Sequence, residues 1–459
     1  FFSSRMKHDP PASSSANAPP QPAAKAKKKK GPKEGPPPPA AQKDLWKTKL
    51  CNNWQHGSCH WGPQCSFAHG EKELRHADRQ AELDPEQSPN ARMWLPPGAD
   101  AAAQQRDFAS DFDPNFIVPG RVANKSAELV HAVNDFHFAM VNDFDRNEFY
   151  RTAMRQVITP ESKVLEIGTG SGLLAMTAAR LGCKWVIAVE ANRHMAALAR
   201  ENIKLNNLSD KITVLSKLST ELEPEDLPDK PDVLISELFG TLLLGESALD
   251  YIHDCRTRVL APRAKIVPPL GCQMATLIEC KQLESITSVT EWGGLDLRHL
   301  NALQDTATVV FTKQYGFRFS TVPHTMVAPP VRILEVDFEK ADPAEMQSEG
   351  RFEIMAEHTG IVHAVLLTWE AFGHDKCASM STHPSESSFQ RDMQWGQALQ
   401  LIEDTQAGDG SQPVPFRVTK GEPLLLIVRY AEDRVVLQFE LRRRAPQNAT
   451  TQPGLGAAT

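Results

Sequence analysis

Two acidic residues stand at the ends of a segment that is otherwise apolar or small. Residues 236–247 read SELFGTLLLGES, which places eight residues between Glu237 and Glu246. Burying carboxylates in such a segment is costly unless a cationic partner neutralises them. A guanidinium group carries five N–H donors in a planar fork and would satisfy both carboxylates. We therefore expect the pair to bind a guanidinium group of a substrate, although the two residues could instead end a strand and begin a helix near residue 246.

A glycine-rich turn lies upstream of this pair. The apolar segment KVLEI (163–167) ends in GTGSG, followed by the helical pattern LLAMTAARLG and by WVIAVE, which closes on Glu190. Strand, glycine turn, helix, strand and terminal acid form a nucleoside pocket, in which the acid binds ribose hydroxyls. Leu173 stands where the dinucleotide fingerprint requires its third glycine. We expect a nucleoside that carries a methionine moiety rather than a diphosphate, unless the turn serves packing alone.

Further elements must position these groups. Apolar periodicity predicts a helix over about 193–206, strands over 212–215 and 232–236, and a helix over about 246–258. Such alternation predicts a doubly wound parallel sheet. From residue 270 onward, short alternating segments separated by turn signals predict an antiparallel β domain.

A helix is also expected upstream of the sheet, over residues 133–154. His137, Met140 and Arg146 are spaced along it so that a cation can reach over the glycine turn. An arginine there suits a cofactor that carries an α-carboxylate, whereas an arginine considered alone is more often a surface salt-bridge residue.

A separate module precedes this region. Cys51, Cys59, Cys65 and His69 follow the spacing C-x7-C-x5-C-x3-H, which suits a closed tetrahedral Zn²⁺ site in a module too small to fold without metal. The segment resembles the CCCH zinc fingers, which bind single-stranded RNA, although the commoner first spacing is eight residues. Its aromatic residues could stack on RNA bases beside nearby lysines; they are Trp54, Trp61 and Phe67.

The charge of the chain is unevenly distributed. The first fifty residues hold eleven Lys and Arg against three acids, whereas the whole chain carries −7. The tail is expected to be disordered, and its lysine run could be a solvated linker, a nuclear-import signal or an RNA contact. No run of eighteen apolar residues and no apolar signal region occur, so we expect no membrane association and a location in the nucleus, the cytoplasm or both.

Together the segments after residue 125 resemble the class I S-adenosylmethionine-dependent methyltransferases, and specifically the protein arginine N-methyltransferases. The resemblance covers about residues 125–443 and rests on HFAMVNDFDRN, VLEIGTGSG, VIAVEAN, SELFGTLLLGES and MQWGQAL. It implies an α/β fold, with a Rossmann-like class I methyltransferase domain followed by an antiparallel β-barrel domain. It also implies S-adenosyl-L-methionine as cofactor, arginine-rich protein substrates, and a homodimer formed through an arm at about residues 288–325.

The resemblance implies roles for individual residues. Glu237 and Glu246 would hold the guanidinium charge on one side, which leaves the remaining nitrogen more nucleophilic. The implied cofactor contacts are His137, Met140, Arg146, Glu166, Gly168, Thr169, Gly170, Gly172, Glu190, Ala191, Leu218 and Ser219. Gln394 and Trp395 are implied substrate contacts. Gln394 stands where many relatives carry histidine, and an amide cannot accept a proton at neutral pH. This departure is most like the monomethylating type III subgroup, arginine methyltransferase seven, although Gly240 stands where that subgroup often has an acid.

The expected organisation is a disordered basic and Pro-rich tail, a zinc finger, a linker, a cofactor-binding domain, a β-barrel domain and a disordered end. The corresponding ranges are 1–44, 45–72, 73–124, 125–269, 270–443 and 444–459. Two other functions stay open: an RNA methyltransferase guided by its finger, and a non-catalytic RNA-binding scaffold. The first would carry an NPPY-like or cysteine-based motif after the fourth strand, where SELFG stands instead.

Overall fold

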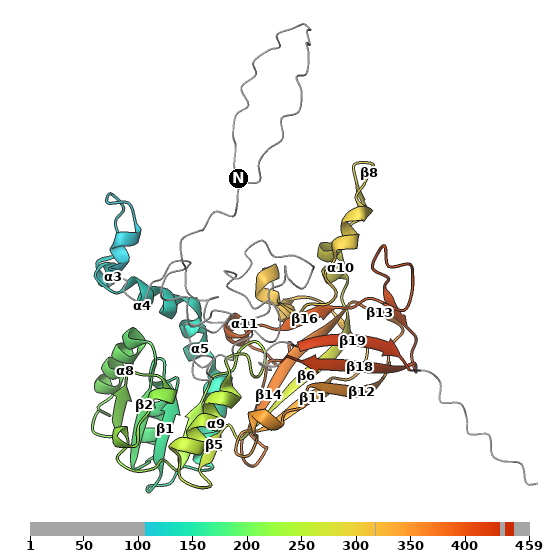
Figure 1. The fold of residues 1–459 in the computed structure, drawn as a ribbon. Helices are drawn as coiled ribbons and strands as arrows, with labels where there is room; N and C mark the ends of the chain where they lie inside the picture. The colour runs from blue at the N-terminus through green and yellow to red at the C-terminus, as the bar shows by residue number, and fades with distance from the viewer. Residues whose placement is uncertain (1–105, 317, 432–436, 445–459) are drawn as a thin grey trace, which may run out of the picture. The chain divides into compact units, whose positions relative to one another are not determined.

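The computed structural model describes residues 106–316, 318–431 and 437–444 (Figure 1). The predicted tail, the zinc finger with its four ligands and three aromatic residues, most of the linker and the C-terminal end lie outside these residues. Within them, no helix is long and apolar enough to cross a membrane.

A parallel sheet forms the first half of the described chain, as predicted. Its strands are β1 (Lys163–Ile167), β2 (Trp185–Val189), β3 (Ile212–Leu215), β4 (Val233–Ser236) and β5 (Lys265–Val267). They lie in the order β3-β2-β1-β4-β5, and every neighbouring pair is parallel. The chain moves outward from β1 to β3 and then returns to place β4 on the other side of β1. The carboxyl ends of β1 and β4 therefore flank the position at which the strand order reverses, where open α/β sheets bind ligands.

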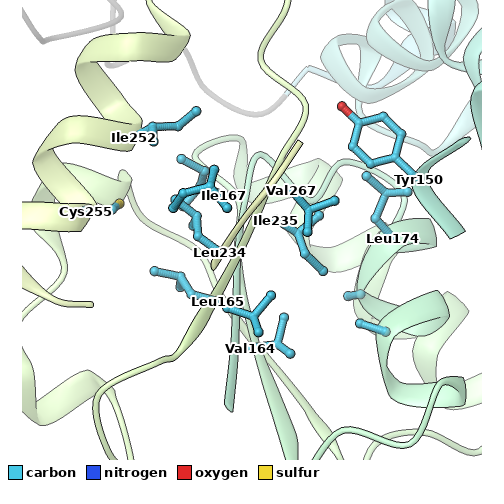
Figure 2. Packing of buried hydrophobic residues seen from close by; sticks show 14 of the residues in the cluster. Tyr150, Val164, Leu165, Ile167, Leu174, Leu234, Ile235, Ile252, Cys255 and Val267 are labelled. Atoms are coloured by element: carbon cyan, nitrogen blue, oxygen red, sulfur yellow. The ribbon is translucent and has the colours of Figure 1, made fainter. Parts of the chain in front are cut away.

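Helices cover both faces of this sheet, and its strands are therefore buried on both sides. The helices are α6 (Phe144–Arg155), α7 (Leu173–Arg180), α8 (Arg193–Leu205) and α9 (Ala248–Arg258), with the 3₁₀ turns η7 (Ser219–Glu221) and η8 (Pro224–Asp226) between β3 and β4. Figure 2 shows Leu165 and Leu234 in the middle layer, with Ile252 of α9 on one side and Tyr150 of α6 on the other. The doubly wound architecture is confirmed.

Short helices precede α6. They are η5 (Phe108–Asp111), α3 (Gly120–Ala123), α4 (Ala127–Ala132), the π-helical turn η6 (Val133–His137) and α5 (Phe138–Asn142). The structure thus differs from the sequence analysis at two points. The single helix expected over 133–154 is interrupted at Asp143, whose side chain caps α6, and residues 108–123, assigned to the linker, include η5 and α3. A bridge between Asp107 and Ser126 closes this segment into a loop, a long-range pairing that local composition does not reveal.

The second half is antiparallel, as predicted, and forms the β-barrel domain. One seven-stranded sheet contains β6 (Leu270–Glu279), β9 (Val310–Phe311), β10 (Thr325–Met326), β11 (Val331–Asp337), β14 (Ala364–Phe372), β15 (Ser379–Ser381) and β16 (Ala398–Leu401). Two smaller sheets contain β12 (Glu349–Met355), β18 (Pro423–Tyr430) and β19 (Leu437–Arg443), and β13 (Gly360–Val362) with β17 (Phe416–Val418). Side chains of all three sheets share one buried core, for example Leu277, Leu426 and Phe416.

The remaining elements connect these strands. They are α10 (Lys281–Thr287), β7 (Glu291–Trp292), β8 (Leu295–Asp296), η9 (Arg298–Leu303), η10 (Thr312–Tyr315), η11 (Phe319–Thr321), η12 (Pro343–Glu345) and α11 (Phe389–Gln394). Figure 1 shows β8 at the far end of the segment that begins with α10, away from β6 and β14. β7, β8 and η9 lie inside the predicted arm of about residues 288–325, whereas α10 precedes it. Within that range, residues 310–311 and Thr325 instead pair with the main sheet.

Candidate active site

The glycine turn follows β1 directly and lies at the reversal of strand order. Gly168, Gly170 and Gly172 have φ angles of 73°, 53° and 85°, a left-handed region that only glycine adopts at little cost. A Cβ at Gly168 would lie 2.8 Å from Leu238 Cδ2, and one at Gly170 would lie 3.6 Å from His137 Nε2. The turn is therefore packed between the segment after β4 and the η6 turn, and a side chain at Gly168 would collide with Leu238.

Two acids support this turn. Glu190 follows β2, and its two carboxylate oxygens accept N–H bonds from Gly170 (2.8 Å) and Asn192 (2.9 Å). A carboxylate has about four lone-pair sites, so the group can still accept bonds from ribose hydroxyls. Glu166 in β1 is buried and accepts the Thr169 hydroxyl at 2.5 Å. Burial, assisted by the charge of Glu190, raises the pKa of Glu166 to about 8.

Arg146 forms an ion pair that the sequence analysis did not anticipate. Its Nη2 donates to Glu237 Oε2 at 2.6 Å, and the two side chains are 3% and 7% exposed. Its Nη1 donates to Asn147 Oδ1 at 2.9 Å. The buried Nε has no hydrogen-bond partner among the described residues. The guanidinium therefore links the cofactor side of the site to the first glutamate and retains a donor for a further anionic group.

His137 lies beside the glycine turn, and Met140 follows it by three residues in α5. The His137 ring stacks on Phe136 with centroids 4.4 Å apart, and its Nδ1 lies 2.9 Å from the Ala132 carbonyl oxygen. Met140 is buried. The structure thus places His137 beside Gly170 of the glycine turn.

The segment that carries the two glutamates is held in place by the β-barrel domain. Trp395 and Trp369 donate their indole N–H groups to the carbonyls of Phe239 (2.7 Å) and Gly240 (2.9 Å). The N–H of Leu243 donates to the side chain of Gln273 at 2.8 Å. A loop of the first domain therefore takes its conformation from side chains of the second. Trp369 and Gln273 were missed because they lie in β strands, where their patterns are those of ordinary core residues.

Glu246 does not cap the helix that follows it. The N-cap position of α9 is Ser247, whose φ is 56° and whose side chain makes no capping bond. Glu246 itself is exposed to solvent. Surrounding protein atoms partly desolvate its carboxyl group, and the Glu237 charge repels it, so the pKa of Glu246 lies above its ordinary value, while Lys313 acts in the opposite direction.

The two predicted substrate contacts take different positions. Gln394 ends α11 and donates from Nε2 to Glu237 Oε2 at 3.3 Å, while its buried Oε1 has no partner among the described residues. Lys313 donates to the backbone carbonyl of Gln394. Trp395 is 3% exposed and also accepts the Thr241 hydroxyl at its carbonyl. Gln394 thus contacts the first glutamate directly, whereas Trp395 supports the loop.

The remaining predicted cofactor residues follow strand ends at the same edge of the sheet. Ala191 is exposed after Glu190, and Leu218 and Ser219 follow β3. The N–H of Leu218 donates to Glu221 Oε2 at 2.9 Å, and Ser219 is buried with its carbonyl bonded to Arg258.

These residues fit S-adenosylmethionine. The buried, unpartnered Nε of Arg146 offers a charge-assisted bond to an α-carboxylate, and Glu190 offers acceptors to a ribose. The four predicted zinc ligands lie outside the described residues. Within residues 106–316, 318–431 and 437–444, no group of three His, Cys, Asp or Glu side chains is placed to hold a metal.

Two family models match the chain. The model of ribosomal protein L11 methyltransferase (PrmA) matches residues 151–245. The match begins in α6 and ends within residues 236–247, the apolar loop that carries the two glutamates. The model of C-x8-C-x5-C-x3-H type zinc fingers "and similar" matches residues 46–71. The predicted CCCH finger is therefore confirmed at the level of sequence, and the first domain is similar to a methyltransferase domain.

Curated relatives are arginine methyltransferases. An arginine N(omega)-methyltransferase from Streptomyces achromogenes subsp. streptozoticus is 34% identical over 236 residues, which cover 51% of this chain and 63% of that protein. Protein arginine N-methyltransferase 7 of Drosophila melanogaster is 29% identical over 268 residues, 53% of this chain and 38% of the relative. Protein arginine N-methyltransferase 9 of Xenopus laevis is 28% identical, with 58% and 35% covered. The aligned parts span about a third to two thirds of these relatives.

Solved structures share the fold. A chain of the Trypanosoma brucei PRMT1 enzyme–prozyme heterotetrameric complex with AdoHcy matches with a TM-score of 0.56 and 22% identity, covering 68% of this chain and 93% of that one. The Arabidopsis thaliana protein arginine methyltransferase 10 matches with a TM-score of 0.51 and 22% identity, covering 66% and 91%. The Rossmann-like and β-barrel architecture and the resemblance to the protein arginine N-methyltransferases are confirmed.

Proposed function

We propose that this protein transfers a methyl group from S-adenosyl-L-methionine to a guanidino nitrogen of arginine in proteins. The observation that carries the proposal is the arrangement at the reversal of strand order. There, Arg146 of the cofactor side binds Glu237, and Glu246 lies on the same apolar loop with a raised pKa. Two carboxylates beside a nucleoside pocket suit a cationic, planar substrate group. Names and folds of the relatives support the same activity.

The residues of this chain would bind and orient both reactants. Arg146, His137 and Glu190 would hold the cofactor, which when bound supplies an electrophilic methyl group on a sulfonium. Glu237 and Glu246 would hold the guanidinium on one side, and charge-assisted bonds of this kind contribute about 1.5–3 kcal/mol each. Positive charge is then kept near the carboxylates, and the remaining nitrogen faces the methyl group.

The proton lost by the methylated nitrogen needs an acceptor. Gln394 occupies the position beside Glu237 and cannot take it. Glu246 is exposed to solvent and has a raised pKa. Its carboxylate can therefore accept this proton and release it to water. We infer that the proton leaves through this glutamate.

Methyl transfer to peptides tests the activity. Radiolabelled cofactor should label an Arg-Gly-rich peptide and leave the same peptide with lysine in place of arginine unlabelled. Labelling of RNA instead would favour the finger-guided RNA methyltransferase. Binding of cofactor without labelling of either would favour the scaffold.

The product is proposed to be monomethylarginine, because Gln394 replaces the histidine found in many relatives. Mass analysis of peptide after long incubation distinguishes the outcomes. An increase of a single methyl group per arginine supports the proposal, and a second increase on the same arginine contradicts it.

A homodimer is proposed from the exposed apolar side chains on the segment from α10 to η9. Trp292, Leu295 and Leu303 are 77%, 63% and 81% exposed, and isolated monomers rarely leave such a cluster uncovered. Light scattering after size exclusion should give twice the chain mass. The Trp292→Ser/Leu303→Ser double variant should elute as a monomer, and a wild-type monomer at micromolar concentration would refute this proposal.

The protein is proposed to act in the nucleus, the cytoplasm or both, and cell fractionation tests this proposal.

The zinc finger is proposed to bind single-stranded RNA with Trp54, Trp61 and Phe67. Fluorescence anisotropy with a labelled oligonucleotide measures this binding. Replacing Trp61 by Ala should weaken RNA binding about 10-fold, since base stacking contributes roughly 1–3 kcal/mol per base.

A further inference from the structure

A second buried ion pair joins the two domains close to the active site. Asp143 is the N-cap residue of α6, and Arg391 lies in α11 of the β-barrel domain. The Nε and Nη2 atoms of Arg391 donate to Asp143 Oδ2 and Oδ1 at 3.0 and 3.1 Å. The two side chains are 4% and 0% exposed. The pair is bidentate, which fixes the relative orientation of the two groups as well as their separation.

The pair has a second connection one helical turn away. Arg146 follows Asp143 by three residues on α6, and Gln394 follows Arg391 by three residues on α11. Both later residues bond the same atom, Glu237 Oε2, at 2.6 and 3.3 Å. The two helices are therefore bridged twice, once by the Asp143–Arg391 pair and once through the glutamate proposed to bind substrate.

Arg391 makes further bonds that hold it in this position. Its Nη1 donates to the carbonyls of Ser381 (2.9 Å) and Glu386 (3.4 Å). Asp143 Oδ1 also accepts the backbone N–H of Arg146 at 3.1 Å. Each charged group is thus satisfied by partners with fixed geometry, and any slide of α11 along α6 would break several of these bonds together.

Net stability is a poor explanation for such a pair. The desolvation cost of a buried ion pair often exceeds its Coulombic gain, and apolar residues of similar volume frequently stabilise as well or better. The best-supported use of buried charges is to specify one register among several. A register between α6 and α11 matters here, because it determines where Gln394 and Glu237 lie relative to Arg146.

We propose that Asp143 and Arg391 are positioning residues that fix the register between α6 and α11 and thereby align the guanidinium-binding glutamate with the cofactor-binding arginine. The inference rests on the proposed function for its kinetic consequence only. Its structural consequence, a fixed Glu237 loop, can be measured whatever the enzyme methylates.

Two variants test the inference. Arg391→Lys retains the charge but loses the planar fork. The double variant Asp143→Asn/Arg391→Gln removes both charges, keeps a side-chain cap for α6 and leaves no unpaired buried ion. Both should lower kcat for an Arg-Gly-rich peptide about 10-fold or more, because misplacement by about 1 Å can cost 10²-fold. The KM for peptide and the Kd for S-adenosylhomocysteine should change less than threefold.

Hydrogen exchange measures whether the two segments are held in place, and it does not require enzymatic activity. Deuterium uptake should rise in peptides covering residues 236–247 and 389–401 of both variants, with other segments unchanged. Arg256→Gln is the matched control, because Arg256 also joins a helix to the second domain by donating to the carbonyls of Phe338, Lys340 and Ala341. It should lower the Tm comparably without changing kcat or uptake in those two segments.

The outcomes separate the two proposals. Variants with a lowered Tm but unchanged kcat and unchanged uptake would show that the pair is purely structural, which overturns the inference. Wild-type protein that binds S-adenosylhomocysteine but methylates no arginine would overturn the proposed function, and the exchange data would then decide the register inference alone. If the double variant fails to fold, Arg391→Lys supplies the same comparison.

Discussion

At the scale of single residues, the sequence suggests separate roles for Arg146 and Glu237, but the structure joins the two side chains in one ion pair. Arg146 was expected to bind a cofactor carboxylate and Glu237 a substrate guanidinium, yet the two side chains bond each other at 2.6 Å. The Glu237→Gln variant should therefore lower methyl transfer at least 10²-fold, because a neutral amide no longer holds the guanidinium charge. Cofactor affinity should stay the same or rise, because Arg146 is freed for the carboxylate. Calorimetry with S-adenosylhomocysteine checks this, and parallel loss of affinity and activity would argue against the assignment.

The raised pKa of Glu246 leads to a pH dependence. Crowding by protein atoms and repulsion by Glu237 favour the protonated form, and a neutral Glu246 binds a guanidinium poorly. Activity should therefore fall as pH decreases, with a midpoint above about 4.3, the ordinary value for Glu. Single-turnover rates between pH 5 and 9 measure the midpoint. Aspartate at this position, which is shorter and further from Glu237, should shift it downward, whereas an unchanged midpoint would show that another group titrates.

At the scale of elements, the apolar loop depends on close backbone packing. A Cβ at Gly240 would lie 3.0 Å from Gly245 Cα, and no flexible side chain is available to move away. Gly240→Ala should displace the loop and lower kcat by about 10-fold or more, with the fold retained. Gly120→Ala is the control, because nothing lies within 4 Å of the added group. Equal activity of the two variants would show that the loop tolerates the displacement.

Glu166 in strand β1 should make the stability of the folded state depend on pH. Glu166 in the folded state keeps its proton up to a pKa of about 8 because it is buried, whereas in the unfolded chain it loses the proton near pH 4.3. The folded state binds more protons between these values, so its stability should decrease as pH rises through this range. Thermal melts should show this decrease in the wild type and a smaller one in Glu166→Gln, and identical slopes would contradict the assignment.

At the scale of the whole molecule, the zinc finger and the two described domains are proposed to act on different partners. The finger has too few residues to fold without its metal, whereas the described domains have extensive cores of their own. Zinc chelation should therefore abolish RNA binding while leaving methylation of a short peptide within twofold. Anisotropy and peptide methylation on the same sample check this. Loss of both activities would show that the catalytic domains also require the metal.

The sequence by itself determined the elements whose signals are local. The zinc-ligand spacing, the parallel sheet, the glycine turn and the acid after β2 follow from periodicity and from residues with special backbone requirements. Only the tertiary structure decided which side chains meet. The ion pairs Arg146–Glu237 and Asp143–Arg391 join residues 91 and 248 positions apart, and the loop between the glutamates is held by Trp369, Trp395 and Gln273 of the other domain. Long-range contacts of this kind depend on how two domains pack, and no local pattern in the chain encodes them.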